Sequence, residues 1–385
     1  MADARREQTV LVLGGGIGGV VAAKRLRKKL GDEHRVILVS RDEDFTFAAS
    51  YLWIMTGDRK PEQITHPLRR LERHGIEVII GEVQKIDPLT RIVVVAGRNI
   101  AANYLVVSLG AQWATERVPG LAGHGHTFST IAGAQLLARQ LASIESGRVS
   151  VVTASPLYKC PAAPYEAALL IDAELRKRGV RDHVEVVVRS AEAAPMPVAG
   201  ANVSTAVEHI LSESDIGYRS SVQITSVEPG LIHFGEDSET TDLLVYMPPI
   251  AAPPVIADSA LAASDGWIHA DPHTLETDFD GVFAIGDNTH IVLKIGKPLP
   301  RAGVFAHAEA LVVADRIAAS ISGGPSDAQF DGHGGCFIET GAGRAAYGSG
   351  NFYADPAPSI EMHTPARRWH WGKEIFEFNV MRRWL

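Results

Sequence analysis

Two cysteines have the most specific chemistry in this sequence, because the 385-residue chain contains no others. So few thiols exclude a disulfide scaffold and leave a reactive pair or two inert core thiols as alternatives. Cys160 lies in the stretch SPLYKCPAAPYEAA, beside Lys159 and just before an expected helix, and both neighbours stabilise a thiolate. Cys336 lies in GGCFIETGAGRAAY, which we interpret as a glycine-rich turn running into a strand. We therefore favour a pair that meets and exchanges thiol, disulfide and persulfide states.

A glycine-rich turn near the N-terminus indicates a dinucleotide site. The stretch QTVLVLGGGIGGVVAAKRLRKKLG predicts a buried strand at Val10–Leu13, a tight turn and an amphipathic helix. Gly14 permits the sharp turn, Gly16 lets the backbone approach a pyrophosphate, and Gly19 allows close packing of helix on strand. A second strand, HRVILVS, follows at the expected distance. The whole pattern favours a pyrophosphate at the helix N-terminus over a tight turn without a ligand.

The residues that hold the rest of the dinucleotide are less regular. An acidic residue usually binds the ribose at the end of the second strand, whereas Ser40 and Arg41 stand at that position here. Downstream, TDFDGVFAIGDNT contains a strand at Val282–Ile285 that ends in Gly286 and Asp287. This pattern resembles two-dinucleotide flavoproteins, in which the strand-end aspartate contacts the ribityl and phosphate part of FAD.

A second segment resembles the same flavoproteins and sets the domain organisation. YLVVSLGAQ, with Gly110, is similar to their strand-and-glycine crossing segment. We predict an α/β protein with two Rossmann-like (doubly wound) domains and a C-terminal α+β region. The FAD-binding domain is expected to be discontinuous, comprising residues 1–111 and 266–325. A second Rossmann-like domain at 112–265 and a C-terminal quinone- or membrane-facing region at 326–385 complete the chain.

The second Rossmann-like domain carries a degenerate nucleotide turn. A strand at Val149–Thr153 and a helix from about Pro164 are predicted, but the turn between them reads ASPLYKCPAAP and has no glycine. Without glycine the backbone cannot approach a pyrophosphate closely, and prolines remove amide donors. This loss counts against NAD(P)H as the reductant, and Cys160 within the turn offers a replacement route for electrons.

The composition of the chain excludes several classes of partner and location. The net charge of −8, without a long basic block, argues against nucleic acid, and no run of about 18 apolar residues predicts a membrane-spanning helix. The N-terminal ARREQTVLVLGG could pass for an export signal, but cleavage would destroy the nucleotide fingerprint, so we expect no export. None of the 15 histidines shows a convincing metal-ligand spacing, so no metal is expected.

The C-terminal stretch RRWHWGKEIFEFNVMRRWL, residues 367–385, interleaves aromatic and basic residues. This composition suits a segment in the membrane interface, where a quinone could enter. A helix packed on its own domain is the alternative.

Three motifs together resemble one family. C-P-x-x-P-Y-E at residues 160–166, C-F-I-E-x-G at Cys336 and RRWHWGKEIFEF near the C-terminus are similar to sulfide:quinone oxidoreductases and to the flavoprotein subunit of flavocytochrome c sulfide dehydrogenases. The resemblance extends from Val10 to Phe378. It implies a redox-active pair, Cys160 and Cys336, that meets over the flavin, and it makes Glu166 a candidate proton acceptor. It further implies quinone contacts at Phe337, Lys373 and Phe376.

Departures from the family pattern limit what the resemblance implies. Ser129 stands where many sulfide:quinone oxidoreductases have a third cysteine, and Gly133 replaces a histidine often found soon after. Ala48, Ala49 and Ser50 occupy the region in which flavocytochrome flavoproteins attach FAD through a cysteine, so we expect no such bond.

The predicted function is FAD-dependent oxidation of sulfide at Cys160 and Cys336 with a quinone as electron acceptor. The protein is expected on the cytoplasmic side of a membrane, attached peripherally, and it could form a homo-oligomer. One alternative is a type II NADH:quinone dehydrogenase, which would need the missing glycine turn. The other is a flavoprotein subunit that passes electrons from sulfide to a cytochrome c partner.

Overall fold

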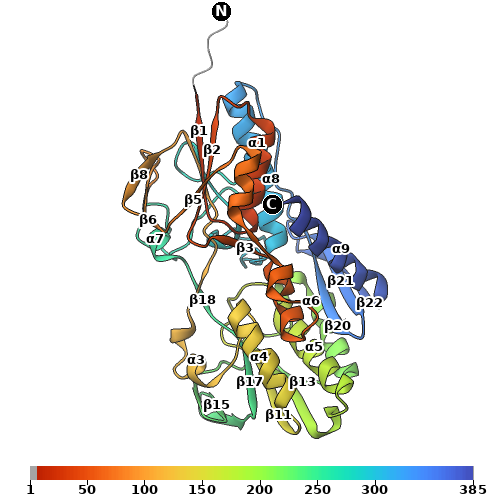
Figure 1. Ribbon diagram of the computed structural model, residues 1–385. Helices are drawn as coiled ribbons and strands as arrows, with labels where there is room; N and C mark the ends of the chain where they lie inside the picture. The colour runs from red at the N-terminus through yellow and green to blue at the C-terminus, as the bar shows by residue number, and fades with distance from the viewer. Residues whose placement is uncertain (1–6, 385) are drawn as a thin grey trace, which may run out of the picture.

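A computed structural model describes residues 7–384 as two parallel sheets followed by an antiparallel sheet and a helix (Figure 1). Arg5 and Arg6, part of the possible export signal considered above, and Leu385 lie outside the described residues. The first sheet has five parallel strands in the order β19-β9-β1-β2-β5. Their bounds are β1 (Thr9–Leu13), β2 (Arg35–Ser40), β5 (Glu77–Ile80), β9 (Tyr104–Val107) and β19 (Val282–Ala284).

Both faces of the first sheet are covered, which explains why its strands are continuous apolar runs. Helices α1 (Ile17–Lys29) and α8 (Gly303–Ser322) lie side by side on one face (Figure 1) and are joined by the Arg25–Asp315 ion pair at 2.7 Å. The other face packs against a small antiparallel sheet and a short helix. These elements are β6 (Val83–Asp87), β7 (Ile92–Val95), β8 (Arg98–Ala101) and α7 (Pro254–Ala257).

The second sheet repeats this plan with four parallel strands in the order β13-β12-β11-β17. Their bounds are β11 (Gly147–Thr153), β12 (Val184–Arg189), β13 (Gly217–Arg219) and β17 (Leu243–Met247). One core cluster joins the sheet to three helices, α4 (Ile131–Ser143), α5 (Ala163–Lys177) and α6 (Ala201–Glu213). A second cluster joins it to a small antiparallel sheet, β14 (Ser226–Glu228), β15 (Leu231–Phe234) and β16 (Asp237–Thr240).

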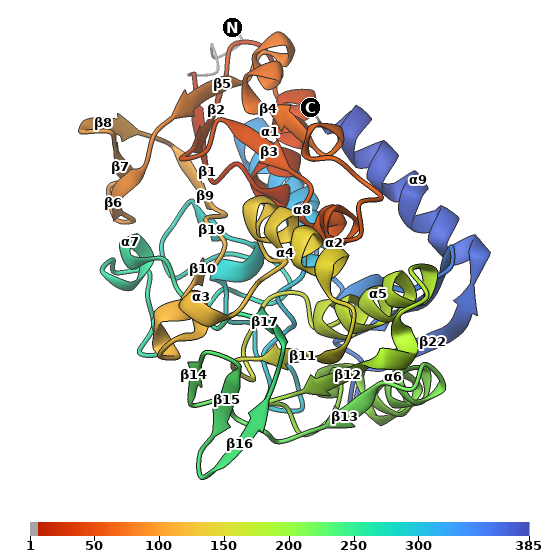
Figure 2. The ribbon, with the colours of Figure 1, turned by 60° about the horizontal axis from the view of Figure 1, so that its bottom comes forward.

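The C-terminal region is an antiparallel sheet with a helix on its outer side. Its strands are β20 (His333–Gly341), β21 (Arg344–Asn351) and β22 (Ser359–Ala366), and helix α9 spans Arg367–Arg383. Figure 2 shows α9 along one edge of the molecule, near α2 (Tyr51–Met55) and away from β6, β7 and β8. The predicted fold class, two Rossmann-like units and a C-terminal α+β region, is confirmed, whereas the exact domain boundaries remain a prediction.

One local expectation, the placement of Cys336 in a turn, changes in the structure. Cys336 lies within strand β20 rather than in a turn, because the flanking GG and FIET residues pair with β21, and Cys336 itself pairs with Gly348. Within residues 7–384, no helix has the length and apolar character needed to cross a membrane. The C-terminal helix α9 instead has one buried side and one exposed aromatic side.

Candidate active site

The turn between β1 and α1 is shaped for a pyrophosphate. No side chain caps the first turn of α1, and no acidic residue lies in it, so its amide groups stay free for an anion. A Cβ added to Gly14 would stand 2.1 Å from the carbonyl oxygen of Ser108, and one added to Gly19 would stand 1.8 Å from that of Gly14. At Gly16 a Cβ would meet no protein atom within 4 Å, so this residue faces open space. The turn therefore fits the diphosphate of a dinucleotide.

The other predicted cofactor contacts gather at the same edge of the first sheet, where its parallel strands end. Ser40 is buried at the end of β2, whereas the Arg41 side chain is exposed and lies 3.5 Å from the Asp42 carboxylate. The Gly110 N–H, beyond β9, donates to the Asn288 side-chain oxygen at 3.2 Å. Ligands of open α/β sheets bind outside this edge, so the placement of Ser40 and Gly110 suits a bound FAD better than that of Arg41.

The segment after β19 reaches the same edge. The Gly286 N–H donates at 2.6 Å to the carboxylate of Glu309, a buried residue of α8. The Asp287 carboxylate lies 3.9 Å from the ammonium of Lys159, which also stacks 4.4 Å from the centre of the Trp113 ring. Lys159 therefore points toward Asp287, and our expectation that it stabilises the Cys160 thiolate is wrong.

The turn between β11 and α5 has few amide donors left for a ligand. Pro156, Pro161 and Pro164 carry no N–H group. The Cys160 N–H donates to the Arg301 carbonyl at 2.7 Å, and the Ala163 N–H donates to the Cys160 carbonyl at 2.9 Å. Cys160 itself has φ of +54°, a left-handed conformation that non-glycine residues rarely adopt. This strained turn aims a thiol at the site instead of amide groups.

The two thiols meet at one cavity of about 110 Å³, lined mainly by apolar side chains. Contact with the Cys336 thiol lowers the pKa of Cys160 against the opposing effect of burial, and the Lys373 ammonium lowers it further. The same contact and burial raise the pKa of Cys336 well above its ordinary value. In the reduced pair, Cys160 is therefore the more acidic of the two thiols.

A buried ion pair lies next to the thiols. The Lys373 ammonium, on α9, donates to the carboxylate of Glu166 in the first turn of α5, and both side chains are about 5% exposed. Burial raises the pKa of Glu166 to about 7 although the charge of Lys373 opposes this. Burial lowers the pKa of Lys373, but the charges of Glu166 and Glu339 more than offset it, so its net direction is upward. The pair thus links α5 to the C-terminal helix beside the redox centre.

One cavity residue escaped the sequence prediction. Glu192 lines the cavity, accepts a hydrogen bond from the Tyr158 hydroxyl and lies 3.4 Å from the Tyr165 hydroxyl. Burial raises the pKa of Glu192 to about 7, although the tyrosine hydrogen bonds lower it. Its position just beyond the carboxyl end of β12 is the signal that could have identified it, because ligands of parallel sheets bind at such ends.

The predicted quinone contacts lie on both sides of α9. Phe337 packs on Tyr347, with 4.7 Å between ring centres, and a Cβ at Gly372 of α9 would come within 3.2 Å of it. Phe376 packs edge-on against Phe47 at 5.6 Å. The structure therefore brings Lys373 near the thiols, while the Phe337 ring packs on Tyr347 and α9, and Phe376 belongs to a separate aromatic contact with the first domain.

An exposed groove runs along α9. Its apolar side chains include Trp371 and Phe378, which are 58% and 57% exposed, and Arg59 forms its other side. Arg59 pairs with Glu377 of α9 at 2.8 Å, so the helix is fixed to the body of the protein on its inner side. One side of this helix therefore packs on its own protein, and the other side exposes aromatic residues.

Comparison with known proteins defines the class. Residues 8–310 match the pyridine nucleotide-disulphide oxidoreductase family, and the chain belongs to this family of oxidoreductases. The mitochondrial sulfide:quinone oxidoreductase of Mus musculus is 23% identical over 384 residues, 95% of this chain and 83% of the relative. The sulfide-quinone reductase of Aquifex aeolicus is 26% identical over 393 residues, 96% of this chain and 89% of the relative.

A solved structure agrees with these relatives. The sulfide:quinone oxidoreductase from Aquifex aeolicus superposes with a TM-score of 0.90 and 22% identity, covering 98% of this chain and 91% of that one. This likeness shows that the two chains share a fold. The family resemblance inferred from the sequence is confirmed.

Proposed function

We propose that this protein oxidises sulfide at Cys160 and Cys336 and passes the electrons through FAD to a quinone. The observation that carries the proposal is the meeting of the two thiols, with opposite pKa shifts, at one apolar cavity beside a buried Glu166–Lys373 pair. The free amides at the first turn support FAD binding, and the amide-poor second turn argues against NAD(P)H.

The asymmetry of the thiols supports a direction of attack. When the pair is a disulfide, hydrosulfide attacks the Sγ atom of Cys336, the S–S bond breaks, and Cys160 leaves as a thiolate. A thiol of lower pKa is the better leaving group, and Cys160 has the lower pKa. Loss of two electrons and one proton then joins the Cys336 persulfide to Cys160 as a bridging sulfur chain. FAD, when bound, would supply the two-electron acceptor, from which the electrons would pass to the quinone.

Two carboxyl groups are suited to accept the protons. Glu192 lines the cavity, and Glu166 lies against the thiols, each with a pKa raised to about 7 by burial. A general base works best when its pKa lies near the working pH. We propose that Glu192 accepts protons released in the cavity. We propose that Glu166, which is paired with Lys373, accepts protons released on the side of the site that faces α9.

The exposed face of α9 is our proposed contact with the membrane surface. Trp371, Ile375 and Phe378 are exposed together on this helix, and arginines occur at both of its ends. Aromatic and basic residues together suit the interface of an anionic membrane. Sedimentation with anionic phospholipid vesicles should recover the wild type and lose most of W371S/F378S, whereas equal recovery would remove this part of the proposal.

The deciding experiment follows flavin absorbance without oxygen. Sulfide should bleach the flavin of the wild type, NADH should not, and a soluble quinone should restore the colour. C160S and C336S should keep their flavin but lose sulfide bleaching by at least about 1,000-fold in rate, because each removes a reacting sulfur. Bleaching by NADH and not by sulfide would overturn the proposal in favour of an NADH:quinone dehydrogenase.

A further inference from the structure

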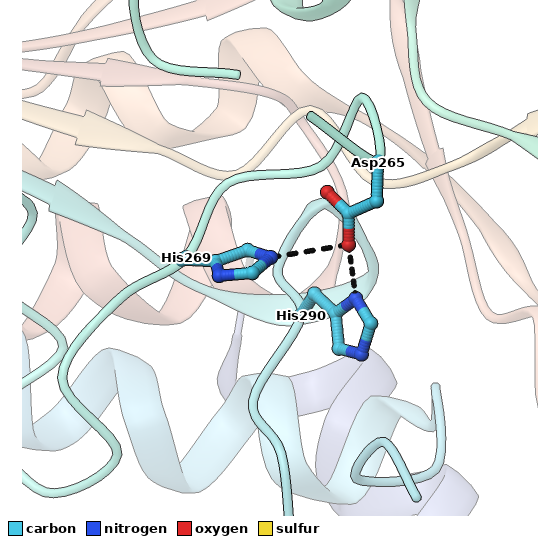
Figure 3. Close-up of side chains that lie close together, drawn as sticks. All are labelled: Asp265, His269 and His290. Carbon is cyan, nitrogen blue, oxygen red and sulfur yellow. Dashed lines mark hydrogen bonds and ion pairs between the residues drawn. The ribbon is translucent and has the colours of Figure 1, made fainter. Parts of the chain in front are cut away.

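Three side chains outside the thiol site form a compact cluster of metal-binding types. Asp265 and His269 lie in the loop between α7 and β19, and His290 lies beyond β19 (Figure 3). Oδ2 of Asp265 lies 3.1 Å from Nε2 of His269 and is in hydrogen-bond contact with Nδ1 of His290. One ligand atom from each residue lies within 4.8 Å of the others.

Backbone hydrogen bonds fix the two loops that carry the cluster. The Ile268 N–H donates to the Asn288 carbonyl at 3.2 Å, and the His290 N–H donates to the Ile268 carbonyl at 2.8 Å. These bonds fasten Ile268, the residue before His269, to Asn288 and to the backbone of His290 itself. The cluster is therefore held from the backbone and does not depend on its side-chain contacts alone.

The carboxylate is oriented by its own neighbour. The Trp267 N–H donates to Oδ1 of Asp265 at 3.1 Å, which leaves Oδ2 facing both imidazoles. Carboxylates and histidines that bind metals are commonly oriented by such a hydrogen bond on their second atom. The Asp265 carboxylate is therefore already oriented toward the other two side chains of the cluster.

We propose that Asp265, His269 and His290 bind a divalent transition-metal ion of the Zn²⁺ type. Two imidazole nitrogens and one carboxylate oxygen match the donors that Zn²⁺ and similar ions prefer, whereas Mg²⁺ and Ca²⁺ prefer oxygen alone. The His269 and His290 side chains are 53% and 26% exposed, so solvent or a further ligand can complete the coordination. Metal–ligand bonds of about 2.0–2.2 Å require the ligand atoms of Asp265 and His290 to move slightly apart. The His269 side chain is exposed and can adjust its position to this change.

The cluster lies close to the segment that we assign to FAD binding. His290 follows Asp287, a proposed FAD contact, by three residues, and the Arg301 side chain donates to the carbonyls of Asp287 and Thr289. Arg301 also stacks 3.9 Å from the centre of the Trp267 ring, so its charge lies near the cluster. This positive charge disfavours a cation at the cluster, and the negative charge of the Asp265 carboxylate offsets it. A bound metal would tie the loop of Asp265 and His269 to the segment that we assign to the flavin.

The test measures Zn²⁺ binding directly, without sulfide, after treatment with a chelator. Because thiols also bind Zn²⁺, the measurement uses both the wild type and C160S/C336S, in the flavin-loaded form. Equilibrium dialysis with metal analysis should find one Zn²⁺ per chain in C160S/C336S at micromolar free metal. D265N, H269A and H290A in that background should weaken binding by more than about tenfold.

Matched controls separate the cluster from other histidines and from misfolding. H209A, which changes an exposed histidine on α6, should bind as its parent does. Zn²⁺ should raise the thermal midpoint of the parent and of H209A but not of H269A, since a ligand stabilises only a fold that binds it. Absence of Zn²⁺ from C160S/C336S, or equal affinity of H269A and its parent, would overturn the proposal. The result does not depend on sulfide oxidation, because no turnover is measured.

Discussion

The two parallel sheets each begin with a strand, a turn and a helix, and the two turns differ in what they present. Between β1 and α1, glycines let the backbone pass close to Ser108 and leave uncapped amide groups at the helix start. Between β11 and α5, prolines and internal hydrogen bonds remove the amides, and a strained Cys160 occupies the turn. One topology thus serves phosphate binding in the first sheet and sulfur chemistry in the second.

The difference shows which part of a Rossmann-like unit is free to change. Strands and helices keep their apolar faces in both sheets, since each must bury one side of a sheet under helices. The first turn places glycines beside the sheet, whereas the second turn also packs into the core through Tyr158 and Ala162, so the chemistry and part of the packing change together. In the second sheet, a thiol site takes the place of the amide groups. Cys160 supplies one part of this site, and the C-terminal region supplies the rest, Cys336 of β20 and Lys373 of α9.

Two glycine substitutions in the first turn, G19A and G16A, should have the largest effects, the first on folding and the second on flavin binding. G19A places a Cβ 1.8 Å from the Gly14 carbonyl, so we expect a loss of about 3 kcal/mol or more and little folded flavoprotein. G16A meets no protein atom and should keep circular dichroism and the thermal midpoint of the apoprotein while its flavin-to-protein ratio falls more than about tenfold. Full flavin content in G16A would show that the turn does not hold a pyrophosphate.

The second turn depends on a buried ion pair, and a double-mutant cycle tests this. K373M leaves the Glu166 carboxyl buried without its partner and should cost about 3 kcal/mol in urea unfolding. E166Q/K373M should recover most of that loss, because no buried charge remains. K373M should also raise the pH at which Cys160 is alkylated, since the Lys373 charge lowers the pKa of Cys160. An unchanged alkylation profile would disconnect the lysine from the thiol.

The sequence was informative where the chemistry is local and misleading where it is long-range. Glycines at a fixed spacing and a cysteine between prolines can be interpreted from neighbouring residues alone. The direction of a side chain cannot be predicted from neighbouring residues alone. The Lys159 side chain points to Asp287 and Trp113 instead of to Cys160. The partner that replaces it, Lys373, lies more than 200 residues along the chain from the thiol, with no local signal.

Sites assembled from several loops escaped the sequence for the same reason. Glu192 enters the cavity from the end of β12, and no short motif surrounds it. We expected no metal because the histidine spacings were unconvincing, yet His269 and His290 are brought together by the pairing of two loops. The fold class was predictable throughout, since buried parallel strands appear as apolar runs of the right length.

Glu192 lines the cavity at the second sheet, whereas the first turn of α1 contains no acidic residue. The pKa of Glu192 rises from 4.5 to about 7 on folding, so the folded chain keeps the proton that the unfolded chain loses between these values. The stability that this provides is complete below pH 4.5 and is lost as the pH approaches 7. E192Q should therefore gain about 1–3 kcal/mol relative to wild type between pH 5 and pH 8 in urea unfolding. A constant difference across this range would contradict the raised pKa.

Rates provide an independent measurement on the same variant. Sulfide itself changes protonation near neutral pH, so the ratio of wild-type to E192Q bleaching rates is the informative quantity. This ratio should rise as the pH passes about 7, where Glu192 becomes a base. A flat ratio would leave Glu166 as the proton acceptor.

The smallest expected effect asks whether a glycine alone converts the second turn into the first. Cys160 has φ of +54°, so C160G should be about 1 kcal/mol more stable than C160S, which keeps a Cβ in the left-handed region. C160G should still resist bleaching by NADH, because three prolines and the bonded amides of Cys160 and Ala163 remain. Bleaching of C160G by NADH would mean that the missing glycine, and not the missing amides, separates the two turns. Equal stability of the two variants would mean that the turn holds Cys160 without strain.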